Sequence, residues 1–272
     1  MLIGDNYVFV ELQKTGSTHI KQQLQALLGG RSEGKHNKPS DEQLGPGRVV
    51  IGSVRDPWSW YLSLWSYGCQ RRGSLYTRLV DPQSWQHSQP LLQARQRERG
   101  DLRLDELTPQ RARDVWYADT GSAQGFQEWL RAVCLPEMRT TVQPGFEPSG
   151  LGAWGCGMMS YRYLKLFTHG VTTLAREVDS VEGLREWTRR HFRPAHMIRL
   201  HALAEDLIET VQALGGRLSP AQCEALRQAR PTNRSSRPHP FGHYYDAQSL
   251  DEVAQREWLL IERHGFQRPP LG

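Results

Sequence analysis

The sequence has little cysteine, and its few cysteines do not cluster. Cys69, Cys134, Cys156 and Cys223 are far apart in a chain of 272 residues, and no C-x-x-C pair is present. Structural zinc sites and disulfide frameworks need cysteine or histidine at short, defined spacings, so neither is indicated. Cys156 alone stands in an unusual setting, the stretch WGCGMM, where a small buried thiol is the ordinary role and a nucleophile the alternative.

Long hydrophobic runs are also missing. No apolar stretch reaches the roughly 18–20 residues that a membrane-spanning helix needs. The first ten residues, MLIGDNYVFV, lack the basic segment of a secretory signal and lead directly into a predicted strand. These absences predict a cytoplasmic protein of bacterial type with no transmembrane segment.

The charge is only weakly biased toward one sign. Lysine and arginine total 34 against 29 acidic residues, a formal net charge of +5. So small and scattered an excess does not indicate nucleic-acid binding, but it suits anionic small molecules or glycans. A hydrophobic content of 38% with nine tryptophans is enough for a sizeable core, and we expect one domain over residues 1–272.

The most informative stretch is Tyr7–Leu28. Tyr7–Leu12 is apolar and β-prone, which predicts a short buried strand. From Ser17 onward the apolar positions follow the spacing of one helix face: Ile20, Leu24, Leu27 and Leu28. Between strand and helix lies the turn Lys14-Thr15-Gly16-Ser17-Thr18. A small-residue turn at the start of a helix presents backbone N–H groups and the positive helix end to an anion, and phosphate is a common ligand of such turns.

A second strand–helix unit follows. Arg48–Val54 is a β-branched run suited to a parallel sheet, and it ends at Arg55. A helix then begins near Pro57, and Ser63 stands eight positions after Arg55. Ligands of open α/β sheets bind beyond the carboxyl ends of the strands, where a guanidinium supplies a forked, permanent positive charge for phosphate.

These two elements resemble those of sulfotransferases that use 3′-phosphoadenosine-5′-phosphosulfate (PAPS), of the carbohydrate type. Lys-Thr-Gly-Ser-Thr is similar to the family's 5′-phosphosulfate loop, and RDPWSWYLS matches its 3′-phosphate element, Arg-x-Pro-x-x-x-x-x-Ser. The resemblance implies an α/β fold with a P-loop-like three-layer core. A central, mainly parallel sheet would be flanked by helices and interrupted by a helical and loop insertion.

The resemblance also implies roles for individual residues. Lys14, Thr15, Gly16, Ser17 and Thr18 would hold the 5′-phosphate, with Lys14 also acting on the bridging oxygen as a catalytic cation. Arg55 and Ser63 would bind the 3′-phosphate. No metal is expected, and the product would be adenosine 3′,5′-bisphosphate.

A late polar loop, PTNRSSRPHPFGHYY, is similar to the family's segment that folds over the nucleotide. The resemblance assigns it four donor-binding residues: Asn233, Ser235, Ser236 and Arg237. A solvated loop is the alternative.

The catalytic base is predicted to be His36. It stands in the Gly- and Pro-rich stretch between the two motifs, where some carbohydrate sulfotransferases place a catalytic histidine. Imidazole titrates near neutrality and therefore suits this task. Glu11, His239 and His243 are the alternatives, and His19 is expected only to pack or cap.

The segment of about residues 70–150 carries no motif and is expected to contribute to acceptor binding. Arg95, Arg97 and Arg99 are weak candidates there, and a solvated helix face is the favoured alternative. Further elements predicted from the pattern are helices at 124–134, 180–190, 203–214 and 248–263 and strands at 171–178 and 195–200.

Three classes of function remain open. The first is sulfuryl transfer from PAPS to a hydroxyl or amine, on a glycan or a small molecule. The second is a P-loop kinase or nucleotidase, which should show G-x-x-x-x-G-K-[ST] and an acidic magnesium ligand, whereas here lysine precedes the only glycine of the loop. The third is a binding module for phosphorylated or sulfated ligands. The sequence does not indicate the acceptor or the oligomeric state.

Overall fold

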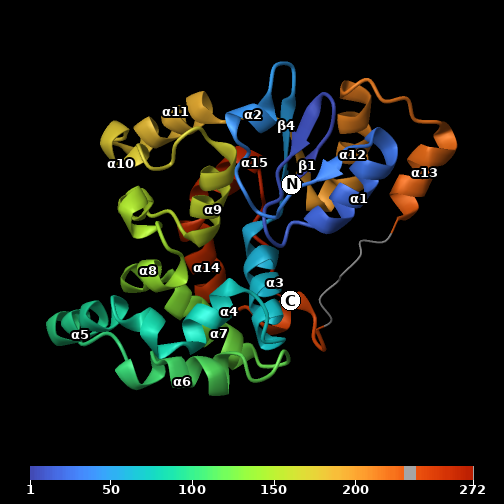
Figure 1. Ribbon diagram of the computed structural model, residues 1–272. Helices are drawn as coiled ribbons and strands as arrows, with labels where there is room; N and C mark the ends of the chain where they lie inside the picture. The colour runs from blue at the N-terminus through green and yellow to red at the C-terminus, as the bar shows by residue number, and fades with distance from the viewer. Residues whose placement is uncertain (230–236, 272) are drawn as a thin grey trace. The chain divides into compact units, whose positions relative to one another are not determined.

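The computed structural model describes residues 1–229 and 237–271 (Figure 1). The chain forms two compact units, each assembled from three segments. Residues 1–56, 162–171 and 188–234 form the first, here called the sheet unit. Residues 57–161, 172–187 and 235–272 form the second, the helical unit.

The sheet unit contains a five-stranded mixed sheet with the order β3-β1-β2-β4-β5. The strands are β1 (Leu2–Ile3), β2 (Tyr7–Phe9), β3 (Arg31–Ser32), β4 (Val49–Val54) and β5 (Pro194–Arg199). Strands β2, β4 and β5 run parallel, whereas β1 pairs antiparallel with both of its neighbours. The α/β class is confirmed, and the expected parallel arrangement holds for the three strands that carry or adjoin the two motifs.

Apolar residues of the sheet pack against helices α1 (Ser17–Leu28) and α12 (Leu203–Ala213), which lie side by side (Figure 1). Ile20 and Leu24 of α1 and Leu207 and Val211 of α12 are each less than 2% exposed in this core. The predicted helical spacing in both segments therefore corresponds to the faces buried on the sheet. The remaining helices of this unit are α2 (Asp41–Leu44) and α13 (Pro220–Gln228).

Strand β4 contains one glycine for a steric reason. A Cβ added at Gly52 would lie 2.5 Å from Met197 Sδ on β5 and 2.9 Å from the ring of Phe167. Both distances are too short for carbon, so glycine here permits close packing of the sheet with the neighbouring chain. This close packing holds Phe167, the last residue of α9 (Met158–Phe167), against the sheet.

The helical unit contains no strand among its described residues. Its helices are α3 (Pro57–Cys69), α4 (Ser74–Val80), α5 (Ser88–Arg99), α6 (Pro109–Arg111), α7 (Ala123–Cys134), α8 (Arg139–Val142), α10 (Leu174–Glu177), α14 (Ala247–Arg256) and α15 (Trp258–His264). Helices α9 and α11 (Val181–His191) contribute residues to both units. Large aromatic side chains form the core: Trp58, Trp60, Trp65, Trp85, Trp116, Trp129 and Trp187 are each at most 1% exposed.

Two predicted elements are wrong. The strand expected at 171–178 is replaced by α10, and its buried residues Val171, Leu174 and Val178 follow helical spacing rather than alternation. The single helix expected at 248–263 is divided into α14 and α15 at Glu257. The buried Glu257 carboxylate accepts hydrogen bonds from Tyr61 Oη at 2.6 Å and Ser160 N at 2.8 Å.

Within the described ranges, no helix combines the length and apolar character that crossing a membrane requires.

Candidate functional site

The turn at 14–18 lies where the sequence predicts it, between a strand and a helix. Strand β2 ends at Phe9 and α1 begins at Ser17. Parallel pairing of Phe9 with Ile51 aligns β2 with β4, which ends at Val54, one residue before Arg55. Both motifs therefore follow the carboxyl ends of adjacent parallel strands, the usual position of a ligand site in an open α/β sheet.

The turn has an unusual backbone. Lys14 has a φ of 64° and Gly16 a φ of 77°, so two of its residues are left-handed. For lysine this conformation is unfavourable by about 1–2 kcal/mol, and such conformations persist where the surrounding structure enforces them, commonly at functional sites. Gly16 lies close to Leu200, which follows β5: a Cβ at position 16 would lie 2.7 Å from Leu200 Cδ1.

Gly16→Ala should therefore destabilise the protein by somewhat more than the roughly 1–2 kcal/mol of left-handed strain, because the terminal methyl of Leu200 must also move to admit the new Cβ. Gly100→Ala is the matched control, because Gly100 has φ 66° and ψ 12°, close to the values at Gly16, and nothing lies within 4 Å of its added Cβ. Chemical denaturation should show the larger loss for Gly16→Ala. Equal losses for the two variants would contradict the contact with Leu200.

The hydroxyl group of Thr15 has a structural task. Thr15 is fully buried, and its Oγ1 donates to Leu12 O at 2.8 Å. Ser53 Oγ, on β4, lies 2.7 Å from the same Thr15 oxygen and must then be the donor. These bonds fix the turn to the neighbouring strand, so a phosphate contact from Thr15 would come from its backbone N–H rather than from its hydroxyl.

The first turn of α1 has the features of an anion site. Gly16 caps the helix without a side-chain hydrogen bond, and no acidic residue occupies the first turn. The N-terminal N–H groups of a helix have no intrahelical acceptor, and its dipole favours negative charge at this end. Ser17 and Thr18 are the first two residues of the helix.

Arg55 reaches the turn. Its Nη1 donates to the backbone oxygen of Lys14 at 3.3 Å, and its side chain is partly buried. The guanidinium of the second motif and the loop of the first motif therefore lie side by side at adjacent strand ends. The sequence places these residues 41 positions apart, and the parallel pairing of β2 with β4 brings them together.

The other residues predicted to bind the nucleotide donor are not part of the described sheet unit. Ser63 is buried in α3 of the helical unit, and its pairing with Arg55 stays a prediction. Asn233, Ser235 and Ser236 lie outside the described residues. Arg237 is described in the helical unit, where burial lowers the pKa of its guanidinium.

One ring nitrogen of His36 is fixed on a backbone carbonyl. Its Nδ1 lies 2.8 Å from the backbone oxygen of Glu11, three residues before Lys14. Because a carbonyl oxygen only accepts hydrogen bonds, the proton of the neutral ring belongs on Nδ1, and the lone pair is on Nε2. Burial lowers the pKa of His36 below 6.5 and outweighs the raising effects of the Glu11 carbonyl and carboxylate. The histidine also holds a left-handed φ of 57°.

The alternative bases have other surroundings. Glu11 is 1% exposed and forms ion pairs with the Met1 amino group at 2.9 Å and Lys21 Nζ at 3.4 Å. The rings of His239 and His243, in the helical unit, are tilted by 33° with centroids 4.0 Å apart, and His243 Nε2 lies 3.0 Å from Gly121 O. His19 is buried on α1, which lowers its pKa, as expected for a packing residue. Of these residues, His36 is the one whose ring contacts the backbone just before the loop, at Glu11 O.

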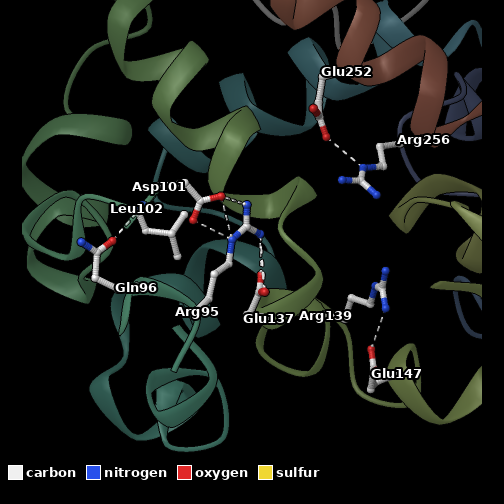
Figure 2. A network of polar contacts seen from close by, with 9 residues as sticks. All are labelled: Arg95, Gln96, Asp101, Leu102, Glu137, Arg139, Glu147, Glu252 and Arg256. Atoms are coloured by element: carbon white, nitrogen blue, oxygen red, sulfur yellow. Dashed lines mark hydrogen bonds and ion pairs between the residues drawn. The ribbon is translucent and has the colours of Figure 1, made fainter. Parts of the chain in front are cut away.

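In the segment expected to bind the acceptor, the candidate Arg95 is ion-paired. Figure 2 shows Arg95 held by Asp101 at 2.7 Å and by Glu137 at 3.1 Å, so two carboxylates offset its charge. A small hollow nearby is lined in part by Arg139, Phe146 and Arg256. Arg139 pairs with Glu147 and Arg256 with Glu252, as the same view shows. Arg95, Arg139 and Arg256 are therefore ion-paired, and the acceptor role of Arg95, Arg97 and Arg99 stays a prediction.

Sequence patterns alone could not identify Ser53, Leu200 or the carbonyl oxygen of Glu11 as parts of this site. Each contributes through a contact made across the sheet or from a neighbouring loop. In the described parts of the chain, no three histidine, cysteine or acidic side chains lie together in a metal-binding arrangement.

Comparison with known proteins found no matching family model, no matching curated protein and no matching solved structure.

Proposed function

We propose that this protein is a sulfotransferase that moves the sulfuryl group of PAPS to an acceptor hydroxyl or amine, on a glycan or a small molecule. The sheet unit would be the P-loop-like, three-layer nucleotide-binding core of such an enzyme. The observation that carries the proposal is the 3.3 Å contact between Arg55 Nη1 and Lys14 O. It supports two anion-binding elements close enough to hold one nucleotide that is phosphorylated at two positions.

The residues of the turn suit the donor's 5′ end. Backbone N–H groups of the turn and the dipole of α1 favour a dianionic phosphate, and the missing acidic residue in the first turn avoids repulsion. The left-handed Lys14 and Gly16 direct the chain around the bound group without a bulky side chain at position 16. The partly exposed Lys14 side chain can then lie beside the oxygen that leaves sulfur.

Transfer needs one bond to form as another breaks. The acceptor oxygen attacks sulfur in line with the oxygen of the 5′-phosphate, which departs with the bonding electrons. Lys14 stabilises negative charge that grows on this oxygen in the transition state, and such selective stabilisation raises turnover. The acceptor proton passes to Nε2 of His36, which the hydrogen bond from Nδ1 to Glu11 O leaves unprotonated.

Arg55 should contribute strongly to the affinity for the nucleotide donor. Arg55→Ala should weaken binding of adenosine 3′,5′-bisphosphate by about tenfold to a hundredfold, because a charge-assisted hydrogen bond contributes about 1.5–3 kcal/mol. Calorimetric titration measures the change. Arg31→Ala is the control, because Arg31 belongs to the same unit, is 75% exposed and pairs only with Glu33 among the ion pairs of the described residues. An Arg55→Ala protein that binds the nucleotide as tightly as wild type would remove Arg55 from the site.

The proposed function itself is tested by comparing ligands. Adenosine 3′,5′-bisphosphate should bind the wild-type protein and raise its Tm, whereas ATP should bind at least tenfold more weakly, because the proposed Arg55 site selects a ribose phosphate. Tighter binding of ATP would favour a kinase or nucleotidase. Binding of the bisphosphate without transfer of labelled sulfate to any glycan or alcohol acceptor would favour a binding module.

A further inference from the structure

A second cluster of basic side chains lies in the sheet unit, at the start of β5. Thr168 and Phe192 form an isolated antiparallel bridge, and Arg193 N donates to Phe167 O at 2.8 Å. This pairing places His169 beside Arg193, with Arg193 Nη2 2.6 Å from His169 Nδ1. Lys38, from the loop that follows β3, donates from Nζ to His169 O at 2.5 Å. Three segments that are distant in sequence therefore bring two cations and one imidazole together.

The cluster has little negative charge to offset these cations. Among the described residues, Asp41 forms an ion pair with the cluster. Its Oδ1 lies 4.0 Å from Arg193 Nη2, and its side chain is 99% exposed. The pKa of Lys38 is lowered by burial and by the charge of Arg193, which Asp41 only partly opposes. The pKa of His169 is lowered by burial and by Arg193, Lys38 and His191. A bound anion would relieve this repulsion.

Arg193 also has unused hydrogen-bonding capacity. Its side chain is only 9% exposed, and within the described part of the chain its Nε and Nη1 have no hydrogen-bond partner. A buried N–H group without a partner is unfavourable by about 1–3 kcal/mol. Guanidinium groups bind carboxylate, sulfate and phosphate through several N–H groups at once, so an oxyanion beside Arg193 would offset the charge, and a rotamer change of Arg193 would bring its buried Nε and Nη1 into contact with the anion.

We propose that Lys38, His169 and Arg193 form a binding site for an oxyanion group, separate from the nucleotide loop. Arg193 directly precedes β5, whereas Arg55 directly follows β4, which runs parallel to it. Six-residue strands span about 20 Å, so the two sites lie at opposite ends of these strands. An anion bound at one site therefore does not occupy the other.

The oxyanion site indicates the chemical class of the acceptor, and this inference rests on the proposed function. Lys38 is two residues after His36, and two residues of chain span at most about 7 Å. An acceptor hydroxyl at His36 and a charged group at the oxyanion site would therefore belong to one short oligosaccharide. The corresponding acceptor is an anionic glycan, with a carboxylate or an existing sulfate group near the hydroxyl that reacts.

The oxyanion site is tested by titrating inorganic sulfate into protein with isotope-labelled histidine and following the ring signals of His169 by NMR. Wild type should show saturable shifts at His169 and none at the exposed His87. Lys38→Gln should weaken this binding by about tenfold to a hundredfold, and Lys35→Gln, at another exposed lysine of the same loop, should leave it unchanged. If Lys38→Gln and Lys35→Gln lower the affinity equally, or if His169 does not respond in wild type, the site is disproved. Arg193→Lys should also weaken sulfate binding, and retained affinity in that variant would equally contradict the proposal.

Titration of adenosine 3′,5′-bisphosphate into the same variants separates this site from the proposed function. Lys38→Gln should bind the nucleotide as wild type does, and a loss of nucleotide affinity would contradict the separation of the two sites. Sulfate binding at His169 in a protein that does not bind the bisphosphate would uphold the oxyanion site and reject the sulfotransferase. For the acceptor class, hexuronate-containing oligosaccharides should shift the His169 signals, and neutral oligosaccharides of equal length should not. Equal responses to both would reject the anionic acceptor.

Discussion

Replacing Lys14 by alanine should lower turnover by roughly 10²–10³, the loss expected when one donor to developing transition-state charge is removed. Binding of adenosine 3′,5′-bisphosphate should change much less, because the backbone of the turn and Arg55 remain. The measurement is sulfate transfer at saturating donor together with calorimetric binding of the bisphosphate.

The conformation of Lys14 provides a matched variant. Lys14 has a left-handed φ of 64°, which asparagine adopts more readily than most residues. Lys14→Asn should therefore keep the turn and lose the cation, and it should be as slow as Lys14→Ala. Lys14→Arg should recover part of the activity because it restores a positive charge. If Lys14→Asn retained wild-type turnover, Lys14 would serve the turn and not the transition state.

Replacing His36 by alanine should reduce transfer by about 10²–10⁴, the range that general-base catalysis contributes, without loss of nucleotide binding. His36→Asn is the sharper variant. Asparagine tolerates the left-handed φ of 57°, and its side-chain N–H can donate to Glu11 O in place of Nδ1. This variant keeps the hydrogen bond and removes the base, so it should be as inactive as His36→Ala. Wild-type activity in His36→Asn would show that the histidine only supports the loop, and His87→Ala should be active as an exposed-histidine control.

The pH dependence of sulfate transfer should also identify His36 as the base. A base works in its unprotonated form, so kcat/KM should rise with pH along a limb whose midpoint is the pKa of His36 in the free enzyme. Burial lowers this pKa, so the midpoint should lie below 6.5, and activity should still be high at pH 6.5. His36→Asn should lack this limb in any residual activity. A midpoint above 6.5 would indicate another base or a solvent-exposed imidazole.

The sequence by itself predicted those elements whose signal is local. The strand–turn–helix around 7–28, the strand ending before Arg55 and the amphipathic faces of α1 and α12 follow from hydrophobic periodicity and from the positions of Gly16 and Pro57. Strands β1 and β3 have only two residues each, too few for a periodic pattern, so their pairing could not be predicted. The division of the last helix at Glu257 depends on a carboxylate that binds the start of α9, 97 residues away in sequence.

Only the tertiary structure decided which residues meet. Parallel pairing of β2 with β4 places Arg55 beside Lys14, and the loop after β3 fixes His36 on Glu11. The oxyanion cluster joins Lys38, His169 and Arg193, which no sequence motif connects. The physical reason is that residue type and periodicity determine whether a segment is a strand or a helix and which face it buries. Contacts between distant segments depend instead on strand order and register, which the chain sets only when it buries several such faces together.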